Sequence, residues 1–149
     1  DFTDNMQHWK SIDNHIIYTG RIDEYYQYRY GMLEYRSVRF EHKWLPNTDN
    51  YQVVAVMNFT DVEPKYTRCI EHKHFLKSQE NVRGTMISFE YPSLSDNDVA
   101  PIYPVRDKRN LSLYEQYRQL ASTEPNVTFF GQLADYRSYN MSHLIEKFI

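Results

Sequence analysis

The arginine of the segment Tyr66-Thr67-Arg68 is the side chain whose chemistry is most readily put to use. Arg68 lies in a run of strand-forming residues from Thr67 to Phe75. Its guanidinium can meet an anionic group with two parallel hydrogen bonds. A strand arginine can also pair with a carboxylate of the protein, such as Glu34 or Glu41. From the residues alone, that structural pairing is the favoured interpretation.

Two histidines follow this arginine closely. His72 and His74 alternate along the chain, so on a strand they would face the same way, and His42 could lie nearby. A metal centre needs a third ligand at a defined geometry, and the spacing fixes none. We therefore expect no metal site, and we interpret Glu71 to His74 as part of the strand that presents Arg68.

Tyrosine is the over-represented residue, with fourteen copies against eight phenylalanines and two tryptophans. Its side chain combines a large apolar ring with a hydroxyl that donates and accepts hydrogen bonds. The surplus suits half-buried strands, and it also suits a pocket for a sugar and its phosphates. Packing in strands is the favoured interpretation for any single tyrosine.

Composition excludes several classes of protein. The 149 residues suffice for one domain with a core, and no apolar stretch approaches the length of a membrane span. A formal charge of −3 gives no case for a nucleic-acid or membrane partner. The single cysteine, Cys69, excludes an intrachain disulfide, and we expect a cytoplasmic protein. The first residues lack a signal-peptide pattern and an initiator methionine, which suggests a processed product or a fragment.

The pattern of apolar residues predicts strands first and helices later. Strands are expected over 15–19, 32–43, 51–59, 67–75 and 85–91, with a turn at 46–50 and a polar connection over 77–84. Residues 51–59 are apolar on both faces, which indicates a strand covered on both sides. The last four of these strands, with short connections, predict an antiparallel meander.

Helical spacing begins after residue 110. Leu113, Tyr117 and Leu120 lie on one helical face, with Asn110 or Ser112 as the cap. A strand over 127–130 and a helix starting near Asn140 follow. The fold class is α+β, with an antiparallel sheet of about four to six strands. We expect 1–24 to be a remnant of one layer, 25–106 the sheet domain, and 107–149 a helix-strand-helix that returns to the first layer.

Three groups of segments carry a resemblance to a known family. They are Tyr18-Thr19-Gly20-Arg21-Ile22-Asp23 with Leu33–Ser37; Asn58–Asp61 with Tyr66-Thr67-Arg68 and Ile70–Phe75; and Tyr103-Pro104-Val105 with Phe130-Gly131, Tyr136, Tyr139 and Met141. Their order and spacing resemble the bacterial UDP-galactopyranose mutases along nearly the whole chain. The resemblance implies an enzyme that interconverts UDP-galactopyranose and UDP-galactofuranose with reduced FAD. The flavin would attack the anomeric carbon as UDP leaves, and the sugar would reclose as the smaller ring.

The resemblance also assigns roles to residues. It implies that Arg68 is catalytic and lies near the diphosphate, and that Asn58 and Tyr103 line the substrate pocket. The layer expected over 1–24 and 107–149 would be the FAD-binding layer. The residues placed beside the flavin are those at the two ends of the chain: Phe2, on a strand beside the adenine, and Gln132, Tyr139, Asn140 and Met141.

Three positions depart from the family pattern. Gln132 stands where the family has an arginine that contacts the flavin, Ser138 where it has a diphosphate-binding tyrosine, and Asn140 where it has an aspartate. A neutral amide at Gln132 would stabilise an anionic flavin less well than an arginine. Losing the phenol at Ser138 removes a donor to phosphate, although Arg137 or Tyr139 could compensate.

A last expectation concerns what the chain lacks. The family binds FAD through a glycine-rich turn, and this chain has four glycines, none close to another. We therefore expect this chain to be a C-terminal part whose partner is the missing N-terminal FAD domain. On its own, the chain should neither hold FAD tightly nor catalyse. We also expect a homo-oligomer. The alternative function is a non-catalytic nucleotide-sugar-binding module derived from the family.

Overall fold

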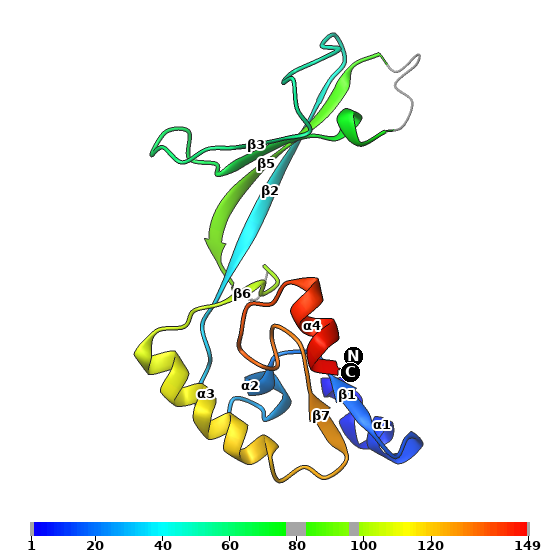
Figure 1. Cartoon of the computed structure of the whole chain (residues 1–149), viewed down its shortest axis with the longest axis vertical. Helices are drawn as coiled ribbons and strands as arrows, with labels where there is room; N and C mark the ends of the chain where they lie inside the picture. Colours follow the sequence, from blue (N-terminus) through cyan, green and yellow to red (C-terminus); the bar gives the residue numbers. More distant parts are fainter. Residues whose placement is uncertain (1, 77–82, 96–98, 149) are drawn as a thin grey trace. The chain divides into compact units, whose positions relative to one another are not determined.

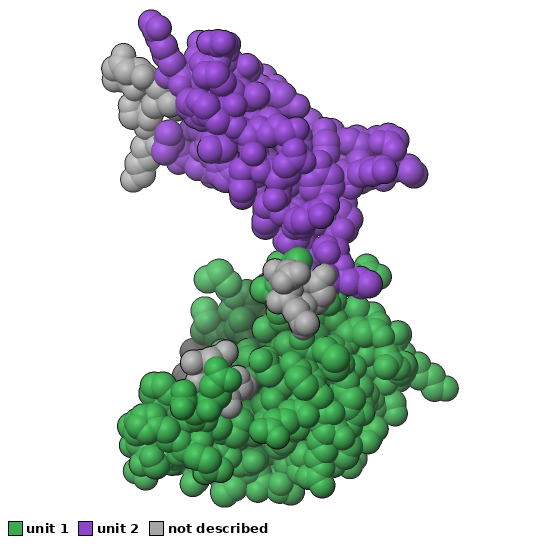
Figure 2. Space-filling model, turned by 180° about the vertical axis from the view of Figure 1, so that it is seen from behind, with its two compact units in different colours: residues 1–36, 95–149 green, residues 37–94 purple. Residues whose placement is uncertain are grey.

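A computed structural model of the chain describes residues 2–76, 83–95 and 99–148. The long strand expected over 32–43 is present in it as β2, Tyr35–Leu45. Most of the polar connection expected over 77–84 lies outside the described residues. The chain divides into unit 1, residues 1–36 and 95–149, and unit 2, residues 37–94 (Figure 2). Residues 25–36 and 95–106 group with unit 1 in this division, and the domain bounds expected from the sequence stay a prediction.

Five strands form one sheet in the order β3-β4-β5-β2-β6 (Figure 1). The other four are β3, Val56–Asn58, β4, Arg68–Glu71, β5, Thr85–Leu94, and β6, Tyr103–Pro104. The pairs β3/β4, β4/β5 and β2/β6 are antiparallel. This sheet confirms the predicted α+β class and strand number. The predicted meander is wrong in one respect, because β2 lies beside β5 and not beside β3.

The strand expected over 51–59 is mostly absent, and a buried carboxylate explains why. Residues 51–55 form bends, and Val53 is 83% exposed. The fully buried Glu71 accepts hydrogen bonds from the backbone amides of Tyr51 and Gln52, at 3.0 and 2.7 Å. The side chain of Gln52 donates in turn to the carbonyls of Val54 and Ala55. Because local partners satisfy these backbone groups, the segment needs no neighbouring strand.

In unit 1, two short strands form a separate parallel pair. These are β1, Ile16–Tyr18, and β7, Val127–Phe129, and they confirm the strands expected near Ile16 and over 127–130. Four α-helices accompany them, at Met6–Ile12 (α1), Ile22–Tyr25 (α2), Lys108–Ala121 (α3) and Met141–Phe148 (α4). Single 3-10 turns lie at Thr3–Asn5 and, in unit 2, at His72–Phe75. In the described parts of the chain, no helix is long and apolar enough to cross a membrane.

Helix α3 starts earlier than its apolar spacing predicts. Asp107 is the N-cap, and its carboxylate accepts a hydrogen bond of 2.7 Å from the backbone amide of Asn110. The predicted caps, Asn110 and Ser112, lie inside the first turns. The polar stretch Lys108–Asn110 hid this start, because residues without apolar periodicity still form a helix once a carboxylate caps it.

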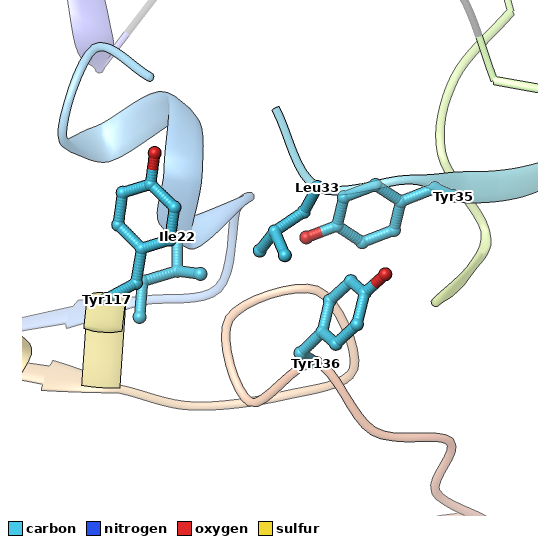
Figure 3. Packing of buried hydrophobic residues seen from close by; sticks show 5 residues of the cluster. All are labelled: Ile22, Leu33, Tyr35, Tyr117 and Tyr136. Atoms are coloured by element: carbon cyan, nitrogen blue, oxygen red, sulfur yellow. The ribbon is translucent and has the colours of Figure 1, made fainter. Parts of the chain in front are cut away.

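Tyrosine rings form much of the core of unit 1. Ile22, Leu33, Tyr35, Tyr117 and Tyr136 form one buried cluster, in which the rings of Tyr35 and Tyr136 meet edge to face (Figure 3). Their hydroxyls donate to backbone carbonyls: Tyr117 to Gly31 at 2.7 Å, and Tyr136 to Glu34 at 2.6 Å. Each of these hydroxyls thereby finds a partner inside the core, as buried phenols usually do. These tyrosines serve packing, but only Tyr35 lies on a strand as expected, since Tyr117 is in α3 and Tyr136 is in a loop.

Candidate functional site

Arg68 lies in the middle of a row of polar side chains that crosses three strands. The strand register pairs Asn58 on β3 with Arg68 on β4, and Arg68 with Glu90 on β5. Residues directly opposite in a sheet share a face, so the three side chains meet. Nε of Arg68 donates to Oδ1 of Asn58 at 2.9 Å, and Nη1 donates to Oε2 of Glu90 at 3.1 Å. The sequence-predicted residues Asn58 and Arg68 are thus brought together.

The carboxylate partner of Arg68 differs from those expected. Glu34 pairs with Arg109 and Glu41 pairs with Lys43, so neither reaches Arg68. The Arg68 side chain is 43% exposed, while that of Glu90 is 13% exposed. A guanidinium carries five N–H donors, and Asn58 and Glu90 take one each. Nε and Nη1 are therefore held by the protein, and the remaining N–H donors of the guanidinium can meet a solvent-borne anion.

Tyr103 belongs to unit 1, whereas Asn58 and Arg68 belong to unit 2. It lies on β6, opposite Arg36 of β2, and its side chain is exposed. An exposed phenol is a neutral donor to phosphate oxygens. Its role in a substrate pocket stays a prediction.

The segment from Gly131 to Met141 holds most of the residues expected beside a flavin. Gly131 has a φ of +97°, which glycine adopts without strain. The side-chain amide of Gln132 donates to the backbone carbonyl of Ile102. Asn140 caps α4, since its Oδ1 accepts a hydrogen bond of 2.9 Å from the amide of His143. This confirms the helix expected to begin near Asn140, and it shows Gln132 turned toward the chain's own backbone.

The other residues of this segment have unequal surroundings. The hydroxyl of Tyr139 donates to Asp135 at 3.1 Å, and Nζ of Lys147 contacts the same hydroxyl and Asp135 at 3.1 and 2.6 Å. Burial lowers the pKa of Lys147, but these two hydrogen bonds outweigh it and hold the pKa above its ordinary value. Ser138 is exposed, and Met141 is 80% exposed. Tyr139 is thus held by polar partners, whereas Ser138 and Met141 are exposed.

Phe2 does not lie on the strand that the resemblance implies. Its backbone has helical dihedral angles, φ −65° and ψ −45°, just before the 3-10 turn Thr3–Asn5. Its ring packs on those of Tyr18 and Tyr25, at centroid distances of 5.3 and 6.2 Å. Contacts among these rings, rather than strand pairing, hold this end of the described chain.

The histidine block departs from the predicted strand. β4 ends at Glu71, and a 3-10 turn follows, so His72 and His74 turn in different directions. His72 and His42 both contact the Ser88 hydroxyl at 2.6 Å, whereas His74 contacts Glu71 at 3.2 Å. His42 thus lies near His72, as expected. Among the residues that the structure describes, no group of three His, Cys, Asp or Glu side chains is placed to hold a metal ion.

Comparison with known families gives this geometry a context. The family model for UDP-galactopyranose mutase matches residues 1–138. The chain belongs to the UDP-galactopyranose mutase family. It spans about a third of the length of the curated relatives it matches, so the mutase-family sequence in hand covers one part of those proteins.

Three relatives from this mutase family illustrate the range. The chain is 38% identical over 135 residues to a dTDP-fucopyranose mutase of Escherichia coli, covering 91% of this chain and 35% of the relative. It is 41% identical over 128 residues to a probable UDP-galactopyranose mutase of Klebsiella pneumoniae, covering 85% and 32%. It is 33% identical over 138 residues to a UDP-galactopyranose mutase of Mycoplasma pneumoniae, covering 90% and 34%. Two kinds of nucleotide sugar therefore occur among the names of its relatives.

Sequence reasoning missed the carboxylates that hold the site residues in this mutase-family chain. Glu90 fixes Arg68, and Asp135 fixes Tyr139 and Lys147. The pairing of Glu90 with Arg68 could in principle be predicted, because the two residues lie opposite each other once the β4/β5 register is known. The contacts of Asp135 have no such sequence signal, because Asp135 lies in a loop without periodic spacing of apolar residues.

Proposed function

We propose that this chain forms the nucleotide-sugar-binding part of a mutase that interconverts UDP-galactopyranose and UDP-galactofuranose. The observation that carries the proposal is the Arg68 guanidinium, which is held by Asn58 at Nε and by Glu90 at Nη1 while the side chain stays 43% exposed. Such a group suits the diphosphate of UDP, because a planar fork gives two charge-assisted hydrogen bonds to phosphate oxygens.

The same guanidinium suits the chemical step. When UDP separates from the anomeric carbon, negative charge builds on the diphosphate, and a nearby cation stabilises the charge that develops. Arg68 is already oriented by two hydrogen bonds, so little ordering is needed when the charge appears. Asn58 orients Arg68 in this proposal. A role for Tyr103, which belongs to unit 1, rests on the family resemblance alone.

FAD, when bound, supplies the covalent chemistry at the sugar. The residues present fit one edge of a flavin site: the N-terminus of α4 after Asn140 is electropositive and presents backbone N–H groups. The amide of Gln132 is turned to the carbonyl of Ile102, and the Tyr139 hydroxyl is bonded to Asp135. We infer that backbone groups at 140–141 would hold the cofactor here, with the remaining contacts made by the rest of the longer protein.

One comparison favours a second sugar for the same site. A relative 38% identical over 91% of this chain is named as a dTDP-fucopyranose mutase. A diphosphate is common to UDP and dTDP sugars, so the Arg68 row would serve either one. A non-catalytic nucleotide-sugar module is the other candidate, supported by the neutral side chains of Gln132, Ser138 and Asn140.

The test uses the complete gene product that contains this sequence, with its flavin reduced. UDP-galactofuranose and dTDP-fucofuranose are supplied in separate reactions, and the corresponding pyranoses are followed by chromatography. Arg68→Lys retains the charge but loses the fork, so kcat should fall about tenfold or more. Arg83→Lys, on an exposed arginine just before β5, is the matched control and should leave the rate unchanged. Binding of UDP without turnover of either sugar would support the non-catalytic module instead.

A further inference from the structure

Unit 1 contains a cavity of about 520 Å³. Of the residues expected beside the flavin or the substrate, it includes Tyr139 but not Asn58, Arg68, Tyr103, Gln132 or Asn140. It is lined by α3, α4, β7 and the segment 131–139, and it includes the side chains of Ile22, Tyr114 and Phe129. Ile22 is buried, and Tyr114 and Phe129 are half-buried. The cavity therefore has an apolar and aromatic floor. Its volume lies within the range of small-molecule sites, which run from about 300 to 1,000 Å³.

The rim of the cavity is cationic. Arg106, Arg118, Arg137 and Lys147 line it, and all four are exposed. Asp135 is the one carboxylate among the lining residues of the described chain. Four cations against one carboxylate give the rim a positive potential, which attracts anions.

Two of these cations are not matched by a carboxylate. Lys147 pairs with Asp135 at 2.6 Å, and Arg118 pairs with Glu115 at 2.7 Å. Arg106 donates instead to the backbone carbonyl of Tyr136 at 2.6 Å. The guanidinium of Arg137 lies 5.5 Å from the ring centroid of Tyr139. In the described parts of the chain, neither Arg106 nor Arg137 forms an ion pair.

A strained residue presents Arg137 at this rim. Tyr136 has a φ of +49°, a left-handed conformation that costs a bulky residue free energy and persists where the surroundings enforce it. Its ring enters the core and its hydroxyl donates to the carbonyl of Glu34. The chain reverses at this point, so that Tyr136 points into the core while Arg137 and Tyr139 line the cavity.

We propose that this cavity binds a phosphate ester, with its apolar or aromatic part on the floor formed by Tyr114 and Phe129 and its phosphate at Arg106 and Arg137. The proposal goes beyond the mutase reaction, because the phosphate would lie at Arg106 and Arg137, and the cavity shares only Tyr139 with the residues expected at the substrate or the flavin. Burial raises the pKa of Tyr114 to about 12, so its phenol remains protonated near neutral pH and can donate to the ligand.

The experiment separates this cavity from the Arg68 site by working in an Arg68→Ala background. Phenyl phosphate is the probe, and its binding is followed by saturation-transfer NMR and calorimetry. Inorganic phosphate carries the charge without the ring, and benzyl alcohol carries the ring without the charge. Phenyl phosphate should bind about tenfold more tightly than either, since only it uses both floor and rim.

The matched variants identify the rim. Arg137→Gln should weaken phenyl phosphate about tenfold, the loss expected for one charge-assisted contact. Arg109→Gln, on an exposed arginine of α3 outside the cavity, should leave the affinity unchanged. The proposal would be overturned if Arg137→Gln and the double variant Arg106→Gln/Arg137→Gln both bound phenyl phosphate as tightly as the Arg68→Ala parent, with the near-UV CD spectrum retained. Loss of all binding in the Arg68→Ala background would overturn it as well, and it would leave the proposed function intact.

Discussion

Arg68 and Glu90 face each other across β4 and β5, and Nη1 of the arginine donates to Oε2 of the glutamate over 3.1 Å. The glutamate is largely covered while the arginine is 43% exposed. The carboxylate therefore orients the guanidinium and also offsets part of its charge. These two effects can be separated by substitution.

Glu90→Gln should tighten UDP binding about threefold. The amide oxygen can still accept the hydrogen bond from Arg68, but the negative charge that opposes an incoming diphosphate is gone. Calorimetry with UDP measures the change. Glu41→Gln, on an exposed glutamate paired with Lys43, is the control and should have no effect. Weaker UDP binding in Glu90→Gln would mean that the carboxylate is needed for more than orientation.

The pairing of Asn58 with Arg68 could be predicted, but only because the sequence resembles a family. The residue pattern alone favours a structural ion pair, and the structure does contain one, with Glu90 rather than Glu34 or Glu41. Strand pairing decides which carboxylate lies opposite an arginine, and β2 lies beside β5 instead of following the expected meander. Pairing between distant strands is not encoded in local periodicity.

Glu71→Ala should destabilise unit 2 by about 3 kcal/mol. The fully buried carboxylate accepts hydrogen bonds from the amides of Tyr51 and Gln52 and from the Thr85 hydroxyl at 2.7 Å. Removing it leaves buried donors without a partner, at about 1–3 kcal/mol for each group. Urea unfolding followed by tyrosine fluorescence measures the loss. A change below about 0.5 kcal/mol would show that the loop 51–55 is held in another way.

The same carboxylate predicts how stability depends on pH. Burial alone would raise the pKa of Glu71, but hydrogen bonds from Tyr51, Gln52 and Thr85, together with His74, outweigh it and hold the pKa below its ordinary value. A lowered folded-state pKa contributes stability above the unfolded-state value of about 4.3. That contribution is lost as the pH falls from there through the folded-state pKa.

The measurement is a series of urea unfolding curves between about pH 3 and pH 6. The protein should lose stability more steeply below about pH 4.3 than Glu71→Gln, which has no proton to gain at this position. The quantity compared is the difference in free energy of unfolding between the two proteins at each pH, so that the contributions of the other carboxylates cancel. Parallel curves would show that Glu71 does not carry the acid dependence.

Asn140→Ala should cost about 1 kcal/mol of stability, because it removes the side-chain cap of α4. Asn140→Asp should be neutral or slightly stabilising, since a carboxylate caps equally well and complements the positive end of the helix. Thermal unfolding of both variants provides the test. Equal losses in the two would indicate that the amide group itself is required.

The end of the chain shows where sequence periodicity succeeds. The apolar spacing after Asn140 predicts α4 correctly, and the strand over 127–130 also forms. Periodicity does not reveal that Gln132 turns to the carbonyl of Ile102, or that Asp135 joins Tyr139 to Lys147. These contacts lie in a loop that contains a left-handed residue at Tyr136, and a tyrosine gives no sequence signal for that conformation.

Self-association of the chain should depend on exposed apolar side chains in unit 1. Ile17 of β1 and Ile145 of α4 are 48% and 55% exposed. Apolar patches of this kind promote association. Light scattering should show a dimer or larger species, and Ile145→Lys should shift it toward monomer. A monomer at high concentration before substitution would contradict the expectation.

The most direct test of the account is a titration of the purified chain with UDP, comparing the unaltered sequence with Arg68→Ala and Arg83→Ala. If Arg68 anchors the diphosphate, Arg68→Ala should weaken UDP binding at least about thirtyfold, since both the charge and the fork are lost. Arg83→Ala should bind UDP as the unaltered chain does. Equal affinity for UDP in all three proteins would contradict the assignment of Arg68 to the nucleotide-sugar site.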